Sequence, residues 1–138
     1  MRPLLGPIVV GVGILLLVQG SACAHSPVGP DDGRVPTGTW GGEHVALTVT
    51  NAGAHVEFDC ASGDIKRPLT VDRNGRFSVD GVLVQEHGPI RRGEEPARYS
   101  GQVDGDAMTL DVILIDSNGT VGTFTLTHGG DQHVTKCV

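Results

Sequence analysis

The stretch TGTWGGEHVALTVTNAGAHVEFDC, residues 37–60, decides the fold of this chain. Val45, Leu47 and Val49 alternate with small or polar residues, and after Asn-Ala-Gly-Ala the alternation resumes with Val56 and Phe58. Successive residues of a strand point to opposite faces of a sheet, so this pattern predicts a β-hairpin with one apolar face. Before it, Gly41-Gly42 is expected to bend the first strand or to mark a bulge.

Short alternating runs separated by Gly, Asn and Asp turns continue along the rest of the chain. Residues 61–64, ASGD, are expected to turn, and Asn74-Gly75 is a strong hairpin signal. Further strands are expected over residues 65–71, 77–84, 98–103, 107–115, 121–127 and 133–137.

About eight short strands without a helical pattern indicate an all-β fold. Tight turns between successive strands favour a single small antiparallel up-and-down β-barrel, whose interior is filled by side chains or holds one small ligand. A two-sheet β-sandwich is the alternative.

Residues 1–24 have the character of an export signal. The apolar run of residues 4–18 is shorter than the roughly 20 residues that a membrane-spanning helix needs. Two processing alternatives remain open: Ala22-x-Ala24 fits cleavage by signal peptidase, whereas Ser21-Ala22-Cys23 resembles the end of a bacterial lipobox, with lipidation of Cys23. Both alternatives predict an exported protein of the bacterial cell envelope, either lipid-anchored or periplasmic or secreted.

The Pro/Gly/Asp-rich residues 25–36 have the composition of a tether, which favours the lipid anchor, and residues 37–138 form the predicted barrel domain. Of the three cysteines, Cys23 belongs to the signal junction. Cys60 and Cys137 remain as an even pair in an exported domain, which predicts a disulfide. Without Cys-x-x-Cys spacing, a metal or redox role for this pair is disfavoured.

The formal net charge of −6 at pH 7 limits the possible partners. Nucleic acids and anionic lipid headgroups are bound through Lys/Arg patches, so neither is expected, and membrane contact is expected only through an anchor on Cys23. The longest expected loop, residues 87–96, holds the candidate partner-facing residues Arg91, Arg92, Glu94 and Glu95.

Gly38-Thr39-Trp40 resembles the opening of the first strand in the calycin group of exported β-barrels, namely lipocalins, avidins and small bacterial metalloprotease inhibitors. The resemblance rests on these three residues and the topology. It implies that Trp40 plugs one end of the barrel. A disulfide from an early strand to the C-terminal region, as between Cys60 and Cys137, also resembles the disulfide of many lipocalins. No ligand-binding residue is carried over from this resemblance.

Two Glu-His pairs, Glu43-His44 and Glu86-His87, are the most visible polar repeats. Adjacent strand residues point to opposite faces, so each pair is expected to divide rather than to form an acid/base or metal site. The sequence HGGDQH of residues 128–133 reads as a polar loop. We therefore expect no catalytic residue, no metal and no cofactor, and no enzyme activity.

These observations predict an exported, lipid-anchored β-barrel binding module for a small apolar ligand. One alternative is a protein-recognition module or protease inhibitor that acts through its loops or its N-terminal segment. Another is a structural envelope protein without a ligand. The residues expected to face the ligand are Leu47, Val49, Val56, Phe58, Phe77, Val79, Leu110, Val112, Phe124 and Leu126.

Overall fold

A computed structural model describes residues 6, 11, 33–87 and 89–138 of the chain. The expected lipidation site Cys23, and nearly all of the expected signal and tether, lie outside these residues. In the part of the chain that is described, no helix is long and apolar enough to cross a membrane.

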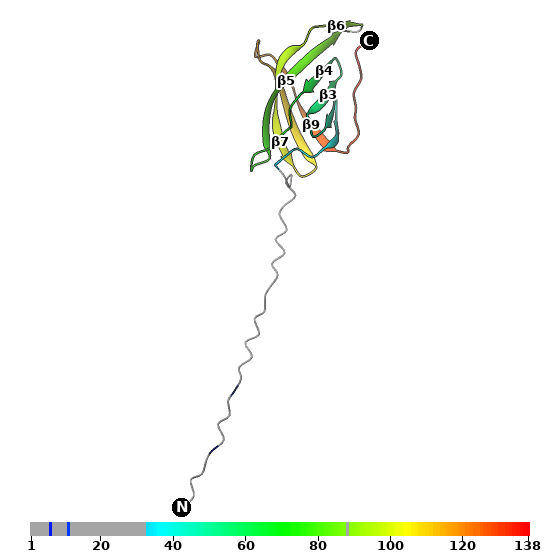
Figure 1. Cartoon of the computed structure of the whole chain (residues 1–138). Coiled ribbons are helices and arrows are strands. Elements are labelled where there is room, and N and C mark those ends of the chain that lie inside the picture. Colours follow the sequence, from blue (N-terminus) through cyan, green and yellow to red (C-terminus); the bar gives the residue numbers. More distant parts are fainter. Residues whose placement is uncertain (1–5, 7–10, 12–32, 88) are drawn as a thin grey trace, which may run out of the picture.

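The described residues form nine strands and no helix (Figure 1). The strands are β1 (Gly38–Gly42), β2 (Val45–Val49), β3 (Ala54–Phe58), β4 (Ala61–Ile65), β5 (Arg76–His87), β6 (Ile90–Arg91), β7 (Glu95–Asp104), β8 (Ala107–Leu114) and β9 (Thr120–His128).

Eight of these strands make a closed antiparallel barrel, which confirms the predicted fold and rules out the sandwich. The strand order is β4-β3-β2-β1-β9-β8-β7-β5, and pairing of β4 with β5 closes the ring. The short β6 pairs only with the end of β5. Because the ring is closed, no strand of the barrel keeps a free edge.

The predicted hairpin of residues 45–58 is present as β2 and β3, with Leu47 opposite Val56. Both side chains are buried, while Thr48 and His55 on the other face are exposed. The preceding β1 pairs in regular register with both β2 and β9. Of the two alternatives expected at Gly41-Gly42, the bulge is therefore wrong and the bend stays a prediction; a register shift occurs between Val112 and Ile113 of β8.

Residues 61–65 form β4, so the turn predicted at 61–64 is wrong. Gly63 explains why small residues occupy this strand. A β-carbon at Gly63 would lie 1.9 Å from the Tyr99 hydroxyl oxygen, and this hydroxyl donates a hydrogen bond to the Val82 carbonyl oxygen at 2.8 Å. The side chain of Tyr99 thus fits inside the barrel because the neighbouring position in β4 is a glycine.

The strand predicted over residues 65–71 is also wrong beyond Ile65. These residues lie against the entry segment, residues 33–36: the Val35 amide donates to the Leu69 carbonyl at 2.9 Å, and the Val71 amide to the Gly33 carbonyl at 2.9 Å. Val35 and Leu69 are both buried. The packed domain therefore includes residues 33–36, which the sequence assigned to the tether.

Residues 129–138, called the C-terminal strap here, run along the outside of the barrel from the end of β9 toward the end that carries β6 (Figure 1). The predicted strand over 133–137 is wrong, since only His133 makes a bridge, to Glu43. The ring is already closed by β4 and β5 and offers no edge for another strand. Instead, Cys137 forms the predicted disulfide with Cys60.

Candidate functional site

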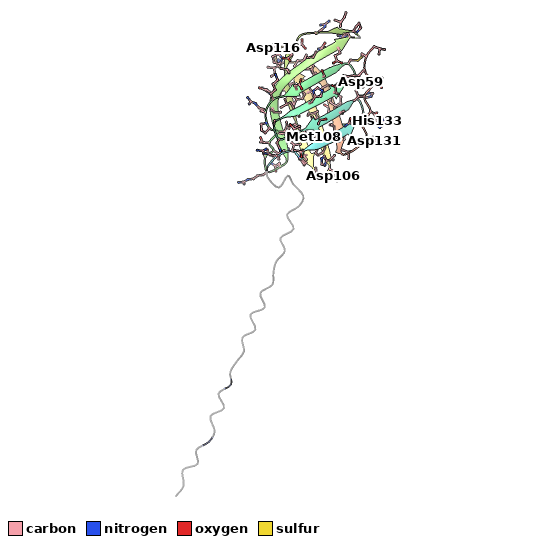
Figure 2. The ribbon with its side chains drawn as sticks, turned by 45° about the vertical axis from the view of Figure 1, so that its right-hand side comes forward. Asp59, Asp106, Met108, Asp116, Asp131 and His133 are labelled. Carbon is pink, nitrogen blue, oxygen red and sulfur yellow. A yellow bond between two sulfur atoms is a disulfide. The ribbon has the colours of Figure 1, made fainter. Side chains whose placement is uncertain are left out.

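The two ends of the barrel differ (Figure 2). Asp106 of the β7–β8 turn marks one end, called the base here, and Asp116 of the β8–β9 turn marks the other, called the mouth. At the base, Trp40 is fully buried, its Nε1 donates to the Pro36 carbonyl oxygen at 3.0 Å, and its ring lies 4.6 Å from that of His128. These contacts place Trp40 near the base; the plug role implied by the calycin resemblance stays a prediction.

The mouth holds a pocket of about 410 Å³, within the size range of small-molecule sites. Its apolar lining comes from the ends of five strands, and its polar rim from turns and the end of β5. The lining residues are His44, Phe58, Asp59, Cys60, Ala61, Leu83, Gln85, His87, Leu114, Gly119, Thr120, Val121 and Phe124.

Two phenylalanine rings anchor the apolar part of the pocket. The Phe58 and Phe124 rings are 5.0 Å apart and tilted by 40°, the offset contact that aromatic pairs prefer. Gly122 makes room for this pair, because a β-carbon there would lie 2.9 Å from the Phe124 ring. Leu83 is buried beside them, and Leu114 and Val121 are partly buried.

Of the ten residues expected to face a ligand, Phe58 and Phe124 line this pocket. Val79 packs partly buried against the core. The other seven are buried in the core itself: Leu47, Val49, Val56, Phe77, Leu110, Val112 and Leu126. Most of the expected lining residues thus pack in the core, and the pocket that Phe58 and Phe124 reach lies at the mouth.

Sequence reasoning missed Leu83, Leu114 and Val121. Leu83 lies in the continuously apolar run 82–84, and the other two flank the β8–β9 turn. Apolar residues next to a turn are a sequence signal for such a pocket, because a residue at the end of a barrel lies beyond the packed core.

A second hollow, of about 420 Å³, lies on the outer face between β5 and the 65–71 connection. Arg67, Asp80 and Arg98 are among its lining residues, and Arg98 Nε pairs with Asp80 Oδ1 at 3.0 Å. Its polar, ion-paired lining is that of a solvated surface. The mouth pocket is therefore the candidate site.

An imidazole and a carboxylate meet at the rim of the mouth pocket. His44 Nδ1 lies 2.6 Å from Asp59 Oδ2, and the Thr135 amide donates to Asp59 Oδ1 at 2.9 Å. The hydrogen bond from Thr135, followed by the one from His44, lowers the pKa of Asp59 below its usual value. Asp59 therefore stays a carboxylate at neutral pH.

In each Glu-His pair, the histidine lines the pocket and the glutamate contacts the C-terminal strap. His44 and His87 line the pocket, whereas Glu43 faces His133 of the strap at 3.9 Å and Glu86 contacts Lys136 at 3.1 Å. Within the described residues, no group of three or more His, Cys, Asp or Glu is arranged to hold a metal ion.

The C-terminal strap holds the β3–β4 turn, which forms one wall of the pocket. Lys136 Nζ donates to the Phe58 carbonyl oxygen at 2.9 Å and to the Ala61 carbonyl oxygen at 3.1 Å, and it pairs with Glu57 and Glu86. The Cys137 amide donates to the Asp59 carbonyl oxygen at 3.0 Å. Partial burial opposes the charge of Lys136, but the two carboxylates raise its pKa, so it stays an ammonium.

The expected partner loop is shorter than predicted. Arg91 belongs to β6 opposite Glu86, the Arg92 amide donates to the Gln85 carbonyl oxygen at 3.0 Å, and Glu95 begins β7. Arg92 and Glu94 are exposed. Ile90 is 65% exposed, and the β5–β6 hairpin that carries it projects from the mouth (Figure 1).

Comparison of the chain with protein-family models, with curated proteins and with solved structures found no match.

Proposed function

We propose that this protein is a binding module that holds a small apolar or amphipathic ligand in the mouth pocket. The single observation that carries the proposal is the pocket itself: about 410 Å³ of space against Phe58, Phe124 and Leu83 at the mouth of the barrel. Apolar walls with a few polar groups at one side are typical of small-molecule sites.

The proposal is tested with N-phenyl-1-naphthylamine, an uncharged probe whose fluorescence rises in apolar surroundings. The purified domain is expected to bind it with saturation at one site. Val121→Trp places a large ring in the pocket and is expected to weaken binding at least tenfold. Thr125→Trp, on the exposed face of the same strand, is the matched control and is expected to leave binding unchanged.

Equal probe binding by the two variants would show that the mouth pocket is not the binding site. Native mass spectrometry of the protein purified from its own host complements this test. A mass that leaves on unfolding identifies the ligand.

We also propose that the protein is exported and lipid-anchored through Cys23. The Cys60–Cys137 disulfide supports an oxidising compartment. In the proposed arrangement, the described chain enters at the base, where Pro36 contacts Trp40, so the mouth is directed away from the anchor. A diacylglycerol mass on the mature chain, lost in Cys23→Ala, is the expected result; an N-terminus at His25 would contradict the anchor.

Recognition of another envelope protein is a second candidate, favoured by Ile90. A single exposed apolar side chain is ordinary on a protein surface, so this candidate rests on the hairpin that presents Ile90 beyond the mouth. Ile90→Lys is expected to abolish co-purification of such a partner from envelope extracts while leaving probe binding intact. Co-purification that persists in Ile90→Lys would exclude the hairpin as the contact.

A further inference from the structure

The charges around the mouth restrict the ligand's polar end. Among the described residues that line the pocket, Asp59 is the only carboxylate, and none is Lys or Arg. The chain as a whole carries −6. An anionic head group at this rim meets the Asp59 carboxylate, and the Lys136 ammonium behind the β3–β4 turn is already paired with Glu57 and Glu86. A neutral or cationic head group meets no like charge from Asp59.

His44 presents a hydrogen-bond acceptor at this rim. The Asp59 carboxylate only accepts hydrogen bonds, so the 2.6 Å contact assigns the proton of the neutral imidazole to Nδ1 of His44. The other ring nitrogen, Nε2, is then an acceptor. None of the described residues hydrogen-bonds Nε2, although the side chain lines the pocket.

The backbone of His44 is held in an uncommon conformation. Its φ of 66° lies in the left-handed region, which residues other than glycine seldom adopt. The strap maintains it, since the His44 amide donates to the His133 carbonyl oxygen at 2.7 Å. Histidine adopts this region more readily than most residues, so the conformation sets the position of His44 at the rim and need not be strained.

A second histidine beside an aspartate shows what a surface pair looks like in this protein. His55 Nδ1 contacts Asp64 Oδ1 at 2.7 Å and its Nε2 contacts Glu57 Oε1 at 2.7 Å. Both ring nitrogens are therefore used within the protein, on the outer face of β3. Among the described histidines, only His44 combines a carboxylate on one nitrogen with a pocket at its side.

We infer that His44, oriented by Asp59, accepts a hydrogen bond from the polar end of the ligand in the mouth pocket. The ligand is then an amphiphile whose head donates a hydrogen bond and carries no negative charge, as an alcohol or a protonated amine does. This inference rests on the proposed function and names the ligand class of the same site.

Four ligands with one tail test the inference: dodecan-1-ol, dodecyl methyl ether, dodecylammonium and dodecanoate, each displacing the naphthylamine probe below its micelle concentration. The alcohol and the ammonium are expected to bind about tenfold more tightly than the ether, which cannot donate. Dodecanoate is expected to bind at least tenfold more weakly than the alcohol.

His44→Asn is the matching variant. Asparagine tolerates the left-handed conformation, and its amide can still donate to Asp59, but it has no atom at the position of Nε2. The preference for alcohol over ether is expected to fall to about unity, with ether affinity retained. His55→Asn, the same change in the surface pair, is expected to keep the tenfold preference.

Two results overturn the inference while leaving the proposed function intact: dodecanoate binding as tightly as dodecanol, or an unchanged alcohol preference in His44→Asn. Because the ligand series is measured on the unmodified protein, it stands even where a variant folds poorly. Failure of the probe and all four ligands to bind overturns the proposed function and the inference together.

Discussion

The base and the mouth of this barrel both contain aromatic side chains, yet only the base is sealed. At the base, residues 33–36 and 65–71 cross the end of the barrel and bury Val35 and Leu69 beside Trp40. At the mouth, Phe58 and Phe124 meet without a crossing segment, and the β3–β4 turn is held from outside by the C-terminal strap. In this barrel, the end that chain segments cross is closed, and the end without such a segment keeps a pocket.

Removing the disulfide tests whether a covalent link supports the mouth. Of the changes considered, it is expected to lower the free energy of unfolding most. In the chain-entropy account, loss of a link between residues 77 apart lowers the free energy of unfolding by about 4.5 kcal/mol. The double variant Cys60→Ser, Cys137→Ser is compared with the oxidised protein by urea unfolding and by probe titration. We expect probe affinity to fall while Trp40 fluorescence in the folded protein stays unchanged; unaltered affinity would show that the strap does not support the pocket.

Truncating one aromatic residue at each end measures the difference in packing. Trp40→Ala removes a fully buried ring and is expected to lower the free energy of unfolding by about 4 kcal/mol. Phe124→Ala is expected to cost about 2 kcal/mol, because Phe124 is only partly buried and borders open space. Urea unfolding of both variants checks the order, and a larger loss at Phe124 would contradict the comparison.

The C-terminal strap packs closely against β1 at Gly41, which has no side chain. A β-carbon at Gly41 would lie 2.3 Å from the Gly130 carbonyl oxygen and 2.4 Å from that of Asp131. Gly41→Ala is therefore expected to displace the strap at a cost of about 2 kcal/mol. Gly93→Ala, whose β-carbon meets no atom within 4 Å, is the control and is expected to change the unfolding free energy little. Equal unfolding free energies for the two variants would mean that the strap shifts freely.

The smallest effect concerns pH and the surface histidine that serves as the reference for His44. Hydrogen bonds to Asp64 and then to Glu57 raise the pKa of His55 above 6.5. The folded state therefore binds this proton more tightly, and its stabilisation is present below pH 6.5 and lost as pH rises through the folded pKa. Since the side chain is 47% exposed, we expect a change below about 0.5 kcal/mol.

Thermal unfolding at several pH values between 5 and 8 checks this, with His55→Asn as the comparison. The variant is expected to lose the part of the pH dependence that His55 supplies. Identical curves would show that solvent screens the His55 network completely.

The sequence predicted the parts of the fold that depend on alternation. Leu47 and Val56 identified the β2–β3 hairpin because an alternating pattern has one structural solution when one face is buried. The same rule failed at β4, where Ala61, Ser62 and Gly63 show no apolar alternation. They are strand residues because they pair with β3 on one side and β5 on the other, and Tyr99 fills the space beside Gly63.

The site was predicted less completely, for a related reason. Phe58 and Phe124 follow from alternation, whereas Leu83 and Leu114 lie where strands approach turns and the pattern ends. The His44–Asp59 contact joins residues on either side of a hairpin and depends on a strap from the far end of the chain. No local pattern encodes such a three-part arrangement.

The pairing of β1 with β9, through Trp40 opposite His128, has a consequence for how the barrel is made. Besides β2, the strand β1 pairs only with β9. Residues far apart in the sequence must therefore meet before the barrel can close. Such non-local pairing is intrinsically slow to form. Until it does, β1 and β9 present open edges that can join strands of other chains. A chain that stops before β9 is therefore an aggregation-prone open sheet, not a smaller barrel.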